Sequence, residues 1–177
     1  MSQAVLSFSC LDLPEGPKDH SLVFELLRYW HGKKADRQIP LRSSLRPEEI
    51  TRHLPFLSLI EFVSSSERPR FRLSGTETRR LLGFDTTGTY VNEIKPAALA
   101  AGLEELLNRL RQDKVPQFVE LRQNEPSGTT TVCHLFLLPF CNDSAEVSQV
   151  CMLIDYGDHG ALIASRMQQF NPLLAAC

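Results

Sequence analysis

The side chains that could carry chemistry in this 177-residue chain are few and widely spaced. Nucleophilic catalysis needs a serine or cysteine beside a histidine and an orienting acid, and no G-x-S-x-G turn is present to expose such a serine. The sequence also lacks the G-x-x-x-x-G-K-[ST] and G-x-G-x-x-G loops that cradle phosphates. The five cysteines, at positions 10, 133, 141, 151 and 177, form no C-x-x-C pair, which indicates reduced thiols in a cytoplasmic protein.

A metal site needs two or more ligands that converge in space. Cys133 and His134 are neighbours on a predicted strand, so their side chains point to opposite faces. Asp155, Asp158 and His159 lie close together at the end of the last predicted strand, where such clusters are more often solvated. We therefore expect no resident metal ion, and we expect His134 to be buried, either as a hydrogen-bonded core residue or as a functional group.

Charge excludes some classes of partner. Nineteen basic and 21 acidic residues give a net charge of −2, which argues against a general nucleic-acid binder. No apolar run approaches the roughly 18 residues of a membrane span, and the N-terminus lacks the pattern of a secretion signal. Residues 28–52 carry seven basic against three acidic groups, and residues 68–80 carry five against one. These two basic segments are either solvated surface or a positive rim for an anionic ligand or acidic partner.

The elements that must position these groups follow from the apolar spacing. Apolar residues at i, i+4, i+7 and i+8 predict an amphipathic helix that starts near Ser21. A second such pattern predicts a long helix over Leu99–Leu110. Five strands are predicted around this helix, as a hairpin before it and an antiparallel meander after it: Leu57–Val63, Arg70–Ser74, Val115–Gln123, Thr129–Phe140 and Ser148–Tyr156.

A family resemblance follows from the run FRLSGTETRRLLGFDTTGTYVNEI at residues 71–94. It resembles the segment of PAS domains in which a strand leads into a short helix ending in Gly-aromatic, here Gly83-Phe84, with Gly88 at the next turn. Both glycines suit a positive φ where the chain reverses. The upstream runs LLRYWHGKKADRQIP and LRPEEITRHLPFLSLIEF are similar, more narrowly, to small stand-alone bacterial PAS proteins.

This resemblance implies an α+β fold: a PAS-like five-stranded antiparallel sheet with a helical insert, residues 75–114, on one face, plus N-terminal and C-terminal helices. The implied spatial order of the strands is second, first, fifth, fourth, third. The expected organisation along the chain is a flexible leader at 1–20, a helical extension at 21–56, a PAS-like domain at 57–156 and a helical tail at 157–177.

The resemblance also allows cofactor-bearing branches of the family to be tested. Flavin-binding photoreceptors carry a reactive cysteine after the glycine turn, and no cysteine occurs between residues 11 and 132. Haem-binding members place a histidine on the long helix, and residues 95–114 contain none. We therefore expect no tightly held coloured cofactor.

A ligand pocket is predicted from the strand register. We expect Phe140 and Ser148 to flank the last turn, so that antiparallel pairing sets His134 opposite Ile154. The long helix and the glycine turn then cover a small apolar pocket, while a one-residue slip would move His134 to the other face. The predicted pocket residues are His134, Tyr90, Phe84, Phe136, Met152 and Ile154, with Arg72 or Arg122 at the mouth.

Both faces of the strand Thr129–Phe140 are apolar, so a further element has to cover the second face. PAS domains pair through an N-terminal helix, and this implies a homodimer. The predicted dimer residues are Leu22, Leu26, Tyr29 and Trp30.

The function that the resemblance implies is a non-catalytic sensory or adaptor module in bacterial signal transduction. Such a module would bind a small apolar or anionic ligand, a partner signalling protein, or both. The alternative is a small α+β cone enzyme, such as an isomerase or dehydratase, in which His134 or Asp155 acts as the base.

Overall fold

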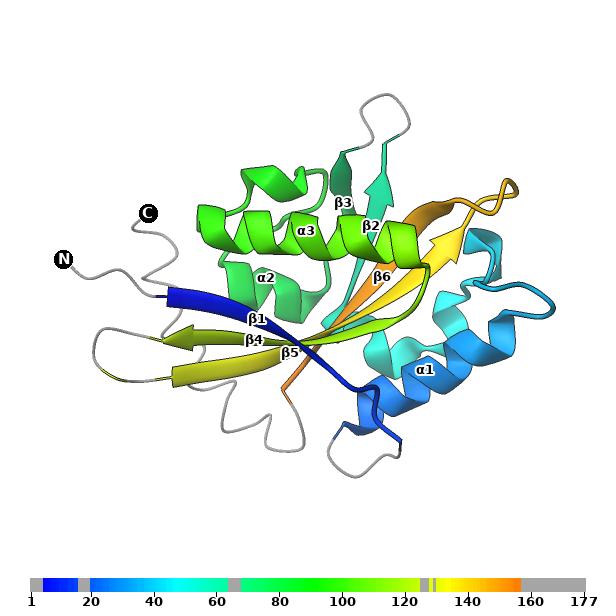
Figure 1. Cartoon of the computed structure of the whole chain (residues 1–177), viewed down its shortest axis with the longest axis horizontal. Helices are drawn as coiled ribbons and strands as arrows, with labels where there is room; N and C mark the ends of the chain where they lie inside the picture. Colours follow the sequence, from blue (N-terminus) through cyan, green and yellow to red (C-terminus); the bar gives the residue numbers. More distant parts are fainter. Residues whose placement is uncertain (1–4, 16–19, 64–67, 125–127, 129, 157–177) are drawn as a thin grey trace.

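The fold is built on one antiparallel sheet of six strands (Figure 1). The computed structural model describes residues 5–15, 20–63, 68–124, 128 and 130–156. Across the sheet the order is β1-β4-β5-β6-β2-β3, which confirms the predicted order of the five expected strands and adds a sixth. The strands are β1 (Val5–Leu11), β2 (Leu57–Phe62), β3 (Pro69–Leu73), β4 (Gln117–Asn124), β5 (Thr130–Cys141) and β6 (Val147–Asp155).

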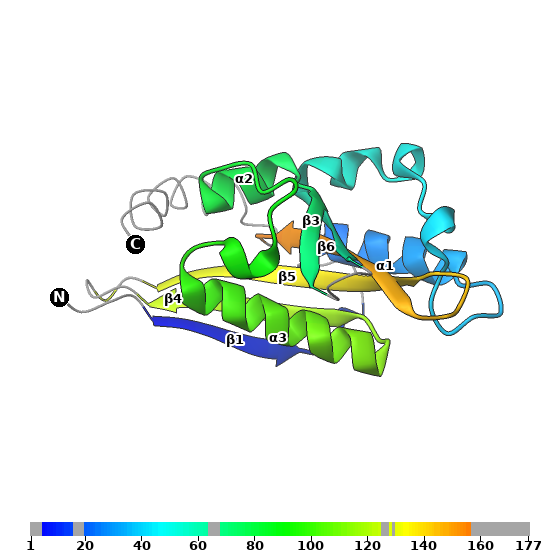
Figure 2. The same cartoon turned by 90° about the horizontal axis from the view of Figure 1, so that it is seen from above.

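Helices cover both faces of the sheet (Figures 1 and 2). Within the part described, none is long and apolar enough to cross a membrane. The helical tail predicted for residues 157–177 lies outside the described residues. The α-helices are α1 (Ser21–Lys33), α2 (Thr76–Leu82) and α3 (Ala97–Asp113), and the 3₁₀ helices are η1 (Arg42–Ser44), η2 (Pro47–Glu49), η3 (Thr51–Phe56) and η4 (Val91–Glu93). As predicted, Gly83 and Gly88 both have positive φ, and Gly83 ends α2.

The sixth strand corrects the flexible leader predicted for residues 1–20. Strand β1 pairs with β4 along the edge of the sheet. Its sequence, VLSFSCL, places Leu6 and Phe8 on one face, where they are partly buried against the core, and serines on the other. This alternation of apolar and polar residues is the pattern of a half-buried strand.

Helix α1 is the cover for the second face of β5. Leu26 and Trp30 are 0% and 1% exposed within the single chain. Leu22 and Tyr29 are half-buried against the same core. The surface predicted for a dimer is therefore occupied by the chain's own sheet, and the homodimer stays a prediction that would have to use other side chains.

The last residues of β5 extend beyond β4, and their backbone groups form hydrogen bonds with a side chain of α1 and with the loop that follows α1. Strand β4 begins at Gln117, opposite Leu137, so β4 does not pair with the last residues of β5, and a bridge between Leu41 and Cys141 lies there instead. Trp30 Nε1 donates a 2.8 Å hydrogen bond to the carbonyl of Pro139, and the Cys141 amide donates to the carbonyl of Pro40. Because buried backbone groups must be paired, these two bonds fix α1 and its following loop against the sheet.

The register between β5 and β6 differs from the predicted one by one residue. His134 pairs with Asp155, and Leu135 pairs with Ile154. Since side chains alternate along a strand, His134 and Ile154 lie on opposite faces of the sheet. The predicted pairing of His134 with Ile154 was therefore wrong.

A β-bulge near the turn causes this difference. Cys141 pairs with Val147, which is the predicted register, whereas Phe140 pairs with Gln149. Ser148 is therefore an extra residue on β6, and every pair beyond it is shifted by one. Nothing in the composition of the turn indicates this extra residue.

Docking of β1 can be tested through Gly102 on α3, because a methyl group there would lie only 2.1 Å from the ring of Phe8. Gly102→Ala should lower the free energy of unfolding by roughly 1–3 kcal/mol, because the ring must move. With Phe8→Ala the clash is absent, so Gly102→Ala should then stabilise by up to about 1 kcal/mol through helix propensity. Urea unfolding of the four proteins measures both values, and stabilisation in both backgrounds would contradict this docking.

The side chain of His53 on η3 contacts α1. Its side chain is buried, and Nε2 lies 3.2 Å from the carbonyl oxygen of Leu22 and 3.8 Å from a Glu25 carboxylate oxygen. Glu25 is itself paired with Arg52. Burial lowers the pKa of His53, outweighing the Leu22 carbonyl and Glu25, which raise it. The folded state therefore favours the neutral imidazole.

This lowered pKa predicts a pH dependence of stability. Between the folded pKa and the unfolded value of about 6.5, the unfolded chain binds the extra proton, so stability should fall as pH decreases. The slope from this group is at most about 1.4 kcal/mol per pH unit. His53→Gln, whose amide can still donate to Leu22, should reduce the slope of urea-unfolding free energies between pH 5.5 and 7. An unreduced slope would show that His53 is not buried as a neutral group.

Candidate functional site

The space between the sheet and helices α2 and α3 is almost completely filled. The cavity there, called the interior cavity, has a volume of only about 20 Å³. That volume is of the order of one water molecule. Its lining is apolar apart from one threonine: Phe71, Thr78, Leu81, Leu82, Ile94, Leu99, Leu103, Leu121, Leu135, Met152 and Ile154.

The structure divides the residues predicted to line a pocket. Met152 and Ile154 line the interior cavity. His134 and Phe136 flank Leu135 in the strand and therefore lie on the opposite face of the sheet. The one-residue shift in register thus separates the predicted polar group from the apolar cavity.

The other predicted positions lie at the surface. Phe84 is 42% exposed. Tyr90 precedes η4, and the guanidinium of Arg68 stacks on its ring, 4.3 Å from the centroid. Arg72 is exposed and lies 4.0 Å from a Glu61 carboxylate oxygen. None of these three predicted residues lines the interior cavity.

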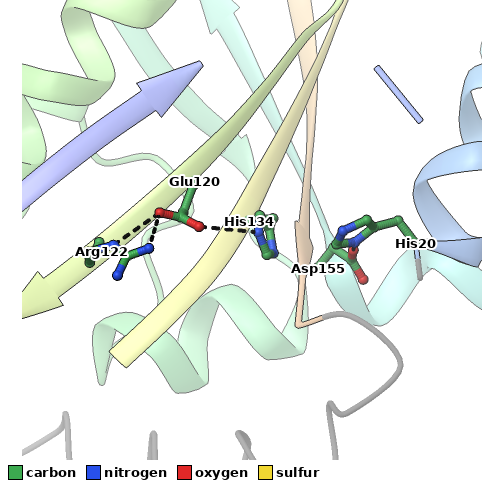
Figure 3. A network of polar contacts seen from close by, with 5 residues as sticks. All are labelled: His20, Glu120, Arg122, His134 and Asp155. Carbon is green, nitrogen blue, oxygen red and sulfur yellow. Dashed lines mark hydrogen bonds and ion pairs between the residues drawn. The ribbon is translucent and has the colours of Figure 1, made fainter. Parts of the chain in front are cut away.

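A row of polar side chains crosses the opposite face of the sheet (Figure 3). Glu120 on β4, His134 on β5 and Asp155 on β6 are direct cross-strand neighbours. Arg122 pairs with Glu120 at 2.7 Å, and His134 Nε2 lies 3.9 Å from the other oxygen of Glu120. His20, the residue before α1, closes the row with a 2.5 Å contact from Nδ1 to Asp155 Oδ2.

Aromatic rings shield the middle of this row. Phe118 stacks on His134 at 5.3 Å between centroids and meets the ring of His20 at 5.0 Å. Burial is the main cause that lowers the pKa of His134, and the neighbouring His20 adds to it, while Asp155 and Glu120 oppose it. His134 Nδ1 is buried and has no hydrogen-bond partner among the described residues.

Sequence reasoning missed two residues of this row, Glu120 and His20. Asp155 is 135 positions away along the chain, so only the packing of α1 on the sheet brings the pair together. His20 occupies the N-cap position of α1 without a side-chain capping bond. Histidine is not a typical capping residue, and this is the one local signal that the side chain has another partner.

A much larger hollow, called the groove, lies where the loop after α1 meets β2, β3 and the β5–β6 turn. Its volume is about 690 Å³. Polar residues outnumber apolar ones in its lining: Leu41, Arg42, Ser43, Glu61, Phe62, Val63, Arg70, Cys141, Asn142, Asp143 and Ser148. The bulge residue Ser148 is among them, and its hydroxyl is buried without a hydrogen-bond partner in the described structure.

Each basic segment of the sequence contributes one arginine to the groove. Arg70 Nη2 pairs with Glu61 at 2.5 Å, and this bond raises the pKa of Arg70. Arg42 makes no ion pair within the described residues. Asp143 adds a second acid to the lining, so the groove presents two charges of each sign and one guanidinium free to pair.

The arrangement offers little for catalysis. His20, His134 and Asp155 line neither the interior cavity nor the groove, so a base there has no adjoining substrate volume in either. Burial raises the pKa of the Cys133 and Cys151 thiols to about 12, which disfavours the reactive thiolate. Neither of these two hollows therefore brings a substrate volume to the acid–base groups of the row.

The sequence matches a family model described as a PAS domain over residues 18–154. The chain therefore belongs to the PAS domain family, as the resemblance of residues 71–94 implied. No curated protein matches the sequence.

Several solved structures are similar to this chain. VqmA bound to DPO matches with a TM-score of 0.48 and 16% identity, over 66% of this chain and 60% of that one. The PAS domain of BvgS from Bordetella pertussis matches with a TM-score of 0.47 and 17% identity, over 69% and 95%. The light state of the Aureochrome1 LOV domain matches with a TM-score of 0.41 and 12% identity, over 69% and 97%. This chain thus spans less than two thirds of VqmA.

The filled interior predicts that apolar probes bind only after a side chain is removed. Met152→Ala should lower the free energy of unfolding by about 2–5 kcal/mol and open an apolar hollow beside the interior cavity. Xenon or benzene should then raise the thermal midpoint of the variant but not that of the unchanged protein. Equal stabilisation of both proteins would show that the interior already accepts ligands.

Proposed function

We propose that this chain is a non-catalytic PAS adaptor module that acts by binding a segment of a partner protein in the groove. The observation that carries this proposal is the contrast between an interior cavity of about 20 Å³ and a groove of about 690 Å³. Sites that enclose small molecules are concave, mostly apolar and able to bury most of the ligand. The interior has the apolar lining but no room, whereas the groove has the room but a mixed, polar lining.

Charge supports an acidic segment as the occupant. Among the described residues Arg42 makes no ion pair, and a carboxylate can accept two parallel hydrogen bonds from its exposed guanidinium. Arg70 Nη2 already pairs with Glu61, and Arg70 Nε is buried without a hydrogen-bond partner in the described structure. We therefore take Arg42 as the selective contact for the carboxylate. The apolar side chains of Phe62 and Val63 would contact the remainder of the segment.

The proposal includes a signalling role in the bacterial cytoplasm, for which membership of the PAS family is the support. The alternative of a cone enzyme with His134 or Asp155 as base is not favoured, because neither residue borders the interior cavity or the groove. A small anionic ligand in the groove is the competing occupant, and the experiment below separates the two.

The test uses a photoreactive benzoylphenylalanine in place of Ser43 in the groove or, as a control, of Asn108 on the exposed side of α3. Irradiation in the native host should yield a discrete protein adduct only from position 43. Arg42→Gln should lower the adduct yield by at least about tenfold, because losing a charge-assisted hydrogen bond costs about 1.5–3 kcal/mol. Arg28→Gln, an equal loss of charge in the same basic segment but outside the groove, should leave it unchanged.

Two results would overturn the proposal. The first is an adduct that forms equally from both positions or survives Arg42→Gln. The second is a native mass spectrum of the purified protein with a bound small anion that Arg42→Gln removes, together with no protein adduct at position 43. That second result would assign the groove to a small ligand.

A further inference from the structure

Three potential metal ligands converge beneath the start of α1. His20, His134 and Asp155 each offer one ligand atom, and these atoms all lie within 4.8 Å of one another. They come from the residue before α1, from β5 and from β6, so the sheet and the helix both hold the cluster. Figure 3 shows the two imidazoles and the carboxylate turned toward one another.

His134 is already oriented as a metal-binding histidine would be. Its Nε2 faces the Glu120 carboxylate at 3.9 Å, and Arg122 holds Glu120 in place. Histidines that bind metals usually direct their second nitrogen at a carboxylate, which orients the ring and increases its basicity. The remaining nitrogen, Nδ1, is buried and makes no hydrogen bond to another side chain in the described structure. A buried, unsatisfied ring nitrogen costs stability unless something binds it.

The short contact between His20 and Asp155 does not explain this nitrogen. That pair satisfies Nδ1 of His20 and one oxygen of Asp155, and it leaves His134 outside. Ligand atoms bound to one ion at about 2.0–2.1 Å in a tetrahedral arrangement lie roughly 3.3 Å apart. The cluster needs the 2.5 Å pair to open and the widest separation of 4.8 Å to close, both by side-chain movements of about 1–1.5 Å.

We propose that His20, His134 and Asp155 bind one divalent transition-metal ion, with zinc as the ion best suited to two imidazoles and a carboxylate. The bound ion would replace the direct contact between His20 and Asp155 and would join α1 to β5 and β6. This site is separate from the groove, so it stands whether or not the proposed partner function does. It also departs from the metal-free protein that the sequence predicts.

The test is calorimetric titration of Zn²⁺ into the full chain after treatment with a chelator. We expect saturable binding of one ion per chain. His134→Phe and His20→Phe, which keep ring packing against Phe118, should each weaken binding by more than tenfold. Glu120→Gln, which removes the charge of the orienting partner and its ion pair with Arg122, should weaken zinc binding by about tenfold. The matched control is His31→Phe on the exposed side of α1, which should bind zinc as the unchanged protein does.

Zinc binding by the cluster must be distinguished from zinc binding by thiols, because cysteine also binds zinc. Cys10 is exposed, so Cys10→Ser should leave the affinity unchanged if the cluster is the site. Co²⁺ as a second probe should give an absorption spectrum without the intense charge-transfer band of thiolate ligation. Circular dichroism of each variant without metal shows whether it folds. If His134→Phe does not fold, His20→Phe, at a half-exposed position, still tests the site.

The proposal fails if Zn²⁺ shows no saturable binding to the folded protein. It also fails if the folded His20→Phe and Glu120→Gln variants bind as tightly as the unchanged chain. Loss of binding in Cys10→Ser, with a thiolate band in the cobalt spectrum, would assign the ion to a cysteine instead.

Discussion

Burial of β5 on both faces is the constraint on which the rest of the structure depends. A strand that is apolar on both sides cannot border water, so one layer of helices has to lie on each side of it. Helices α2 and α3 cover one side and fill it so completely that about 20 Å³ remains. Helix α1 covers the other, and its docking brings His20 to Asp155 and the loop containing Arg42 to the β5–β6 turn.

The sequence predicted the central fold well because its signals are local and strong. Helix periodicity and the glycine that ends α2 locate the elements along the chain, and the family resemblance implies the order of five strands in the sheet. Strand β1 was missed although VLSFSCL alternates as a strand should, because Pro14, Gly16 and Pro17 immediately after it favour a loop. The cover over β5 was assigned to a second copy because spacing shows that a helix has a wide apolar face and does not show which chain it packs on.

The polar row could not be predicted from the sequence, for a different reason. Glu120, His134 and Asp155 form a row only when two strand registers are known, and the bulge at Ser148 changes one of them. A single extra residue costs little energy and leaves no compositional trace, yet it reverses the face on which His134 meets the residues of β6. Of the predicted lining, Met152 and Ile154 lie at the interior cavity, whereas His134 and Phe136 lie on the other face of the sheet.

Strand β1 pairs with β4, and helix α1 packs on β5 and β6. These contacts limit the order in which the chain can fold on the ribosome. The elements made first need partners that are translated more than 100 residues later, as the contact of His20 with Asp155 illustrates. Until β6 emerges, the apolar side of α1 has no sheet to cover and is open to other nascent chains. Non-local pairing of this kind also slows folding, which prolongs the time for which these apolar surfaces are exposed.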